Sequence, residues 1–181
     1  MGNKITIDSA TMMNKGLEII EAHWLFDMEP NEIDIVVHPQ SIIHSMVEFK
    51  DRSVKAQLGI PDMKIPIQYA LTYPKHIDSE WESLDLASIG SLTFEYPDLE
   101  KFPSIKLAHD ALRTGGTTPA VLNVVNEYAV YKFLNNEIKF MDIPKMVEQA
   151  CEGHDWIKHP DFETLFELEA WSIEFVNSFQ S

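Results

Sequence analysis

Apolar residues recur at two spacings along this 181-residue chain, and the two spacings separate an N-terminal part from a C-terminal part. In residues 13–26 the apolar positions fall on one stripe when each residue turns the chain by about 100°, which predicts an amphipathic helix. Polar residues occupy a different face of the same helix. The apolar stripe consists of Met13, Leu17, Ile20 and Trp24, and the polar face carries Asn14, Lys15 and Glu18.

Alternating or continuous apolar residues predict strands on both sides of that helix. Residues 4–8 (KITID) alternate like a short strand, and residues 33–37 (IDIVV) form an apolar run typical of a buried strand. Residues 43–49 and 53–59 read as two strands joined by a polar turn at Lys50–Arg52, which predicts a hairpin. A helix is predicted from Asp62 to about Tyr73, with Pro66 in its first turn.

The periodicity fades between residues 75 and 103, where prolines interrupt a mostly irregular stretch, and this stretch is the predicted linker. Beyond it the pattern is helical. The expected fold class is therefore α/β (α+β): a sheet layer with covering helices in residues 1–74, followed by a small all-α bundle in residues 104–181. The predicted helices of the bundle cover 104–113, 119–134 and 143–152, and a last one starts near Asp161.

Composition and charge restrict the possible partners. The chain has 14 Lys and Arg against 29 Asp and Glu, a formal charge of −15. This balance speaks against binding to nucleic acid or an anionic membrane, because both need basic residues opposite phosphates. A single cysteine, Cys151, excludes an intrachain disulfide, and the sequence contains neither a secretory apolar core nor an apolar run of about 20 residues. We expect a cytoplasmic protein.

The polar face near the start of the first helix suits an anion. Free backbone N–H groups at a helix start favour negative charge, Ser9 and Asn14 would add neutral hydrogen bonds to phosphate, and Lys15 would add a positive charge. Glu18 would repel phosphate unless it faced a cation, so a hard divalent metal is its natural partner. A plainer alternative stays open: a capped surface helix in which Lys15 and Glu18 form an i, i+3 ion pair.

Four blocks carry a resemblance to a known family. They read KITIDSATMMNKGLE, HPQSIIHSMV, QLGIPDMKIPI and GGTTPAVLNVVNE, and in order and approximate spacing they are similar to the 1-deoxy-D-xylulose 5-phosphate reductoisomerase family. The resemblance implies NADPH-dependent conversion of the phosphorylated sugar to 2-C-methyl-D-erythritol 4-phosphate with Mg²⁺ or Mn²⁺, in a homodimer. It implies that Ser9, Asn14, Lys15 and Glu18 contact the substrate, that Glu18 is a catalytic metal ligand, and that Gly2 and Met63 lie by the cofactor.

The chain also departs from the family. No Gly-rich nucleotide-binding turn is present, and the family's Asp-Ser-Glu metal motif should lie upstream of the region that matches Met1. Asp78–Glu80 repeats those letters in the wrong order along the chain. We therefore expect a C-terminal half, with residues 1–74 as the end of the catalytic domain, that has no activity alone. The alternative is a noncatalytic dimerisation or regulatory module.

Two weaker candidates remain. Cys151, His154 and His159 have the spacing C-x₂-H-x₄-H, which suggests zinc only faintly because a fourth ligand is missing. The GGTTPA stretch at residues 115–120 could cradle a phosphate, but it lacks the lysine of a P-loop. We interpret the first as structural and the second as a connection between helices.

Overall fold

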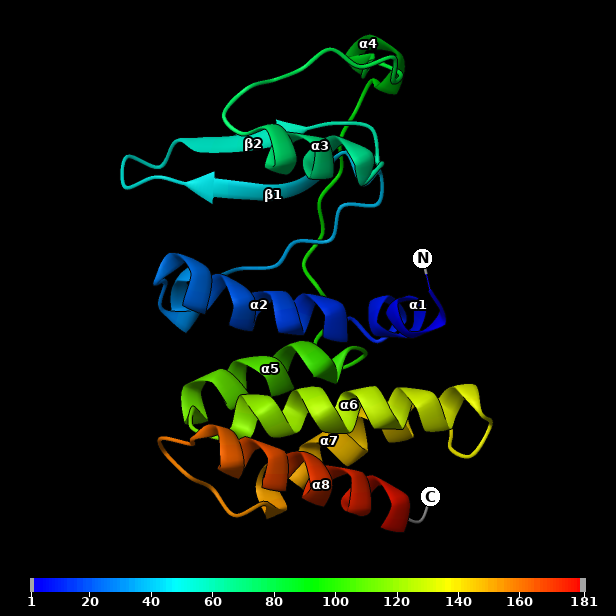
Figure 1. Cartoon of the computed structure of the whole chain (residues 1–181). Coiled ribbons are helices and arrows are strands. Elements are labelled where there is room, and N and C mark those ends of the chain that lie inside the picture. Colours follow the sequence, from blue (N-terminus) through cyan, green and yellow to red (C-terminus); the bar gives the residue numbers. More distant parts are fainter. Residues whose placement is uncertain (1, 180–181) are drawn as a thin grey trace. The chain divides into compact units, whose positions relative to one another are not determined.

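The computed structural model describes residues 2–179, and this part of the chain is mostly helical (Figure 1). Its one sheet is a two-stranded antiparallel hairpin. None of the described helices has the length and apolar character needed to cross a membrane. The helices are α1 (Asn3–Ala10), α2 (Met13–Phe26), α3 (Lys64–Thr72), α4 (Leu86–Ile89), α5 (Pro103–Thr114), α6 (Thr118–Leu134), α7 (Asp142–Gly153) and α8 (Phe162–Ser178), with a 3₁₀ turn η1 (Pro30–Glu32); the strands are β1 (Ile43–Glu48) and β2 (Val54–Leu58).

The chain forms two compact units, and the first is discontinuous in sequence. The first unit runs up to Ile35 and resumes at Asp98, whereas the second is Val36–Pro97. This grouping differs from the predicted boundaries at residues 74 and 103, because α1 and α2 pack on the C-terminal helices. Residues 75–102 are mostly irregular, with the single turn of α4 and the bridge at Glu95, and their role as a linker stays a prediction.

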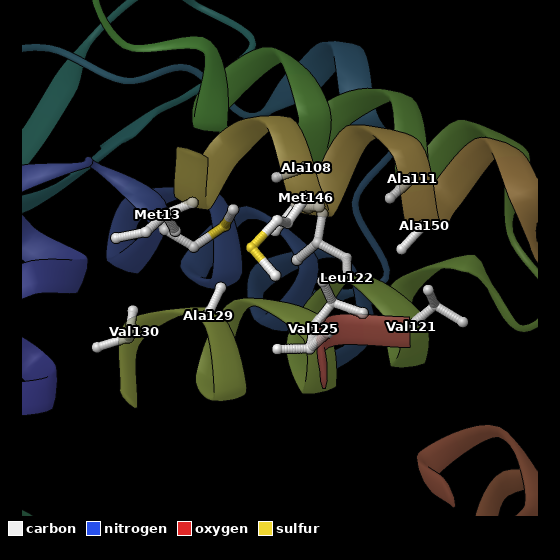
Figure 2. Close-up of a cluster of buried hydrophobic side chains, with 13 residues drawn as sticks. Met13, Ala108, Ala111, Val121, Leu122, Val125, Ala129, Val130, Met146 and Ala150 are labelled. Carbon is white, nitrogen blue, oxygen red and sulfur yellow. The ribbon is translucent and has the colours of Figure 1, made fainter. Parts of the chain in front are cut away.

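The core of the first unit lies among α2, α5, α6, α7 and α8. Figure 2 shows Met13 of α2 beside small and branched side chains of α5, α6 and α7. Removing this apolar surface from water is the main favourable term in folding the unit. The fully buried members are Met13, Ala108, Val121, Leu122, Val125, Ala129, Val130, Ile143, Met146, Val147 and Ala150.

Gly16 allows α2 to approach α5 closely. A Cβ at this position would lie 2.8 Å from the Ala108 Cβ and 3.1 Å from the Ser104 carbonyl oxygen, and both atoms belong to α5. Real Cβ atoms do not approach one another at the first distance, so only glycine fits without a shift of the helices. The sequence therefore carries a glycine inside a helix, at a cost in helix propensity, because packing requires it.

A buried carboxylate ties α1 to α6. Asp8 is 1% exposed; its Oδ1 accepts a hydrogen bond of 2.9 Å from Asn126 Nδ2, and its Oδ2 pairs with Lys4 Nζ at 2.7 Å. A buried charge is tolerated only when it is paired and hydrogen-bonded. The contact joins residues that are 118 positions apart in the sequence.

The helix predictions over residues 13–26, 62–73 and the four C-terminal segments are confirmed. Side-chain hydrogen bonds mark the starts of two of these helices. Asp161 caps α8, since its carboxylate accepts the Thr164 N–H at 2.8 Å, and Asp62 accepts the Lys64 N–H at 2.9 Å at the start of α3. These backbone hydrogen bonds also lower the pKa of both carboxyl groups.

The strand predicted over residues 4–8 is wrong, because these residues belong to helix α1. The sequence alternates over too few residues to exclude a helix. In the helix Lys4 and Asp8 are one turn apart and form their ion pair, while Ile7 packs against the core. Tertiary contacts outweigh a strand preference that β-branched residues would otherwise favour.

The buried strand predicted over residues 33–37 is also wrong. Within the described chain only Val37 pairs with another segment, in an isolated bridge to Glu95 with hydrogen bonds of 2.8 and 2.9 Å. Ile33 and Ile35 instead pack beside Ile105 and Leu112 of α5. The expected sheet layer with covering helices is therefore reduced to the hairpin.

The hairpin itself is confirmed, with β1 and β2 paired antiparallel and Met46 opposite Ala56. Every residue of the two strands except Ile43 is exposed. Large apolar groups are among them: Met46, Val47, Val54 and Leu58. An isolated two-stranded hairpin is at best marginally stable in water, so this sheet lacks the partner surface that such a pattern requires.

Replacing Gly16 with alanine should destabilise the first unit by about 1–3 kcal/mol, because the added methyl group would overpack the contact with Ala108. Gly153→Ala is the matched control, since a Cβ at the last residue of α7 would meet nothing within 4 Å. Chemical denaturation followed by circular dichroism measures both. Equal stability of the two variants would contradict the packing account.

Asp8→Ala should lower the free energy of unfolding by about 1–3 kcal/mol, because it leaves the buried Asn126 amide without its acceptor. Asp110→Ala removes an aspartate whose ion pairs with Lys106 and Arg113 are exposed, and it should have a much smaller effect. Urea midpoints of the two variants, compared with the unaltered chain, give the difference. A larger loss from Asp110→Ala would refute the role of Asp8.

Candidate functional site

A tight turn between α1 and α2 sets the geometry of the candidate site. Met12 lies in the left-handed region with φ of 60°, which lets the chain leave one helix and enter the next. The hydroxyl of Thr11 binds both helices, because Oγ1 lies 3.1 Å from the Ile7 carbonyl oxygen and accepts the Met13 N–H at 3.3 Å. The site is thus built between two helices rather than between a strand and a helix.

Asn14, Lys15 and Glu18 lie together at the start of α2, as their spacing predicts. Lys15 Nζ is 2.9 Å from Glu18 Oε1 and 2.7 Å from Oε2, and Asn14 Nδ2 donates to Oε1 at 2.8 Å. The side chains of Lys15 and Glu18 are 41% and 46% exposed. The i, i+3 ion pair of the plainer alternative is therefore confirmed, and the same three groups remain accessible to a ligand.

Ser9 and Gly2 lie on the neighbouring helix. Ser9 is exposed near the end of α1, and its carbonyl oxygen accepts the Met12 N–H at 3.2 Å. Gly2 is the exposed residue that precedes α1, and a Cβ there would meet nothing within 4 Å. Ser9 is thus close in sequence to the turn, while the predicted cofactor role of Gly2 stays a prediction.

Met63 belongs to the second compact unit, where it precedes α3 and is 67% exposed. A shallow pocket of about 190 Å³ lies nearby, with Tyr69, Thr72, His76 and Trp81 in its wall. None of the predicted site residues lines this pocket. Its volume is also below the roughly 300 Å³ at which small-molecule pockets begin. The predicted role of Met63 beside a nicotinamide stays a prediction.

Glu18 is a residue type that binds divalent metals, but no further candidate ligands cluster with it among the described residues. Within residues 2–179 no three His, Cys, Asp or Glu side chains cluster in a way that could hold a metal ion. Carboxylate oxygens are the ligands that Mg²⁺ and Mn²⁺ prefer, so the residue type fits. Asp78 and Glu80 are exposed in the other compact unit.

The zinc-like spacing near residue 151 has a structural explanation. His154 is buried, its Nδ1 lies 3.0 Å from the Cys151 carbonyl oxygen, and its Nε2 lies 2.9 Å from Thr117 Oγ1. Burial raises the pKa of the Cys151 thiol to about 12, so the thiol keeps its proton at neutral pH. Both ring nitrogens of His154 are used in hydrogen bonds, and His159 is exposed.

The GGTTPA stretch is held against the segment that follows α7. Thr117 N–H donates to the Ile157 carbonyl oxygen at 3.0 Å, and Ile157 N–H donates to Thr117 Oγ1 at 3.1 Å. Gly116 has φ of 57°, and a Cβ there would collide with the Ile157 carbonyl oxygen. This loop is therefore a closed connection between α5 and α6, as its interpretation as a helix–helix connection predicted.

Sequence reasoning missed the residues that hold the site in place. Asp8 and Asn126 fix α1 to α6, and Gly16 fixes α2 to α5. Only Gly16 left a signal, because a lone glycine inside a helical pattern usually has a packing reason. The pairing of Asp8 with Asn126 has no local signature, since it depends on the fold.

Two family descriptions match the chain. The first, "DXP reductoisomerase C-terminal domain", matches residues 58–175, and the second, "1-deoxy-D-xylulose 5-phosphate reductoisomerase C-terminal domain", matches residues 1–26. Curated proteins with the name 1-deoxy-D-xylulose 5-phosphate reductoisomerase are 57% identical to the chain in Acetivibrio thermocellus and 55% identical in Heliobacterium modesticaldum. Each comparison covers 97% of this chain but only 46% and 45% of the relative.

Solved structures give the same relationship. The reductoisomerase from Zymomonas mobilis in complex with NADPH superposes with a TM-score of 0.90 at 45% identity, over 97% of this chain and 46% of that one. A DOX-P reductoisomerase in complex with NADPH, fosmidomycin and magnesium superposes with a TM-score of 0.91 at 43% identity, over 98% of this chain and 46% of that one. The chain thus spans less than half the length of these relatives.

Thr117→Val should destabilise the chain by about 1–3 kcal/mol, because it leaves the part-buried Ile157 N–H and the buried His154 Nε2 without their partner. The neighbouring Thr118→Val is a matched control, since the buried Thr118 hydroxyl has no hydrogen-bond partner among the described residues. Thr118→Val should be neutral or stabilising in thermal denaturation. A similar loss in both variants would contradict the structural role of the Thr117 hydroxyl.

Proposed function

The chain belongs to the 1-deoxy-D-xylulose 5-phosphate reductoisomerase family, matching its C-terminal region, and on that premise we propose that it is the substrate- and metal-binding part of such an enzyme. The enzyme would convert 1-deoxy-D-xylulose 5-phosphate to 2-C-methyl-D-erythritol 4-phosphate with NADPH and a divalent metal, in the cytoplasm. The observation that carries the proposal is the cluster of Asn14, Lys15 and Glu18 at the start of α2.

Asn14 and Lys15 would bind the phosphate group of the substrate, together with Ser9. Lys15 supplies a positive charge in a chain whose net charge is −15, so the attraction has to be local. Asn14 and Ser9 add neutral donors, and the start of α2 adds the positive end of a helix dipole. A solved relative in complex with fosmidomycin supports a ligand site in this family.

Glu18 would be one ligand of the divalent metal and would lie next to the substrate. Its exposed carboxylate suits Mg²⁺ or Mn²⁺, and relatives in complex with magnesium support a metal in the family. When bound, such a metal acts as a Lewis acid on substrate oxygens and fixes their orientation. Because the described residues offer no further clustered ligands, Glu18 would need partners from outside this chain.

Met63 would pack by the nicotinamide of NADPH, and the backbone at Gly2 would lie near the cofactor. A Cβ at Gly2 would meet nothing within 4 Å, and the exposed Met63 can offer a flexible, polarisable thioether to a ring. The sequence has no Gly-rich nucleotide-binding turn, so the remainder of the NADPH site would lie in the part of the relatives that this chain does not span.

The exposed hairpin is where we place protein contacts, including a homodimer. Its apolar side chains Met46, Val47, Val54 and Leu58 face solvent on strands that need a covering surface. The same feature favours the second candidate function, a noncatalytic dimerisation or regulatory module. The two functions differ in one respect: only the first requires Glu18 and Lys15 for its activity.

The chain alone, with NADPH, Mg²⁺ and 1-deoxy-D-xylulose 5-phosphate, should show no NADPH oxidation, because it holds one metal carboxylate and no complete hydride-donor site. Mixing it with the N-terminal segment of the Acetivibrio thermocellus relative, up to the start of the match, should restore turnover. Glu18→Gln should then reduce the rate at least about a hundredfold, the order of loss expected when one charge-stabilising group is removed.

Glu21→Gln is the matched control, because it removes the same charge one turn further along α2 and should leave the rate unchanged. Turnover by the chain alone would contradict its dependence on the missing part. A Glu18→Gln mixture as active as the Glu21→Gln mixture would remove Glu18 from the metal site and favour the noncatalytic module.

A further inference from the structure

Glu18 is hydrogen-bonded to the two side chains that would bind phosphate. Its Oε1 accepts from Asn14 Nδ2 at 2.8 Å and from Lys15 Nζ at 2.9 Å, and its Oε2 accepts from Lys15 Nζ at 2.7 Å. The ammonium of Lys15, the amide of Asn14 and the carboxylate of Glu18 are therefore already paired with one another. A phosphate on Lys15 or a cation on Glu18 would compete with this pairing.

We propose that the Asn14–Lys15–Glu18 cluster is an exchange device that couples cation binding to phosphate binding. A divalent cation on Glu18 would release Lys15 and Asn14, whose donors would then turn to the phosphate. By linkage, phosphate on Lys15 and Asn14 would free Glu18 for the cation to the same extent. This inference rests on the proposed function, because it assumes that these residues bind those two ligands.

Electrostatic repulsion explains why the two ligands should bind together rather than one at a time. The paired Lys15 and Glu18 are neutral together and attract neither ion strongly. A phosphate that took Lys15 alone would face an unpaired Glu18 only one turn away, and the two negative charges would repel each other. A cation on Glu18 removes that repulsion, so the state with both ligands bound is favoured over either state with one.

The surroundings allow the side chains to move while the backbone stays in place. Both charged side chains are about half exposed, and an exposed ion pair is weak enough to be exchanged readily. Gly16 lies between them in sequence and packs tightly on Ala108 of α5, and Met13 is fully buried. The helix that carries the cluster is therefore held, and only the ends of the side chains need to turn.

A titration with Mg²⁺ alone tests the exchange directly. The ¹⁵Nζ signal of Lys15 and the ¹³Cδ signal of Glu18 would be followed by NMR in the chain. Both should shift together, and the Lys15 signal should move toward its position in the Glu18→Gln variant. A Glu18 signal that shifts while Lys15 stays would overturn the exchange and leave the metal contact standing. If neither shifts, the exchange is overturned; the metal contact of the proposed function, which needs partners from outside this chain, is tested by the Glu18→Gln mixture instead.

Inorganic phosphate provides the second test. In the absence of metal, Glu18→Gln should bind phosphate roughly three- to fivefold more tightly than the unaltered chain, the range set by the strength of an exposed ion pair. Glu21→Gln controls for the loss of one negative charge and should change the affinity less. Equal gains in the two variants would overturn the exchange, because simple repulsion would then explain them.

Lys15→Gln separates the two hypotheses. It should weaken phosphate binding in both the unaltered and the Glu18→Gln background. If phosphate binds equally well without Lys15, the phosphate site of the proposed function is wrong and the exchange is overturned with it. If Lys15 is needed but Glu18→Gln brings no gain, only the exchange is overturned.

Discussion

The close contact between Gly16 of α2 and Ala108 of α5 is the constraint on which the first compact unit depends. Because a Cβ at Gly16 would lie only 2.8 Å from that of Ala108, the backbone of α2 at Gly16 packs directly against the Ala108 side chain of α5. This contact lets Met13 pack into a core formed by α5, α6 and α7, which all lie far along the chain from α2. The same orientation of α2 leaves Asn14, Lys15 and Glu18 outside the core.

The site is a consequence of that orientation. Burying Met13 and Gly16 on one face of α2 leaves Asn14, Lys15 and Glu18 half-buried or exposed on another, and the turn at Met12 places α1 beside them. The buried Asp8 shows how differently a carboxylate behaves when the fold encloses it. Asp8 has a buried amide partner and a structural role, whereas Glu18 and its partner Lys15 are both about half exposed.

The second unit has the opposite character. Its hairpin exposes apolar side chains on both strands, and Val37 pairs with Glu95 in a single bridge rather than in a strand. The chain spans less than half of the length of these relatives. An exposed apolar hairpin of this kind is stabilised when another surface covers it.

Local physics was enough to predict most helices, because an apolar stripe and a capping side chain such as Asp161 act within a few residues. It also predicted the hairpin, and the grouping of Asn14, Lys15 and Glu18 on one helix face. The family membership followed from blocks of sequence, and the comparisons confirm the family.

Only the tertiary structure decided the rest. KITID is a helix and IDIVV is not a strand, because a short alternating or apolar run fits either state until long-range contacts choose one. The partner of Asp8 lies 118 residues away in the sequence. Glycine is needed at position 16 because α5 packs against it, and no pattern within α2 predicts that contact. The sequence by itself determined which residues could bind a ligand, and the packing of distant helices determined which of them stayed exposed to do so.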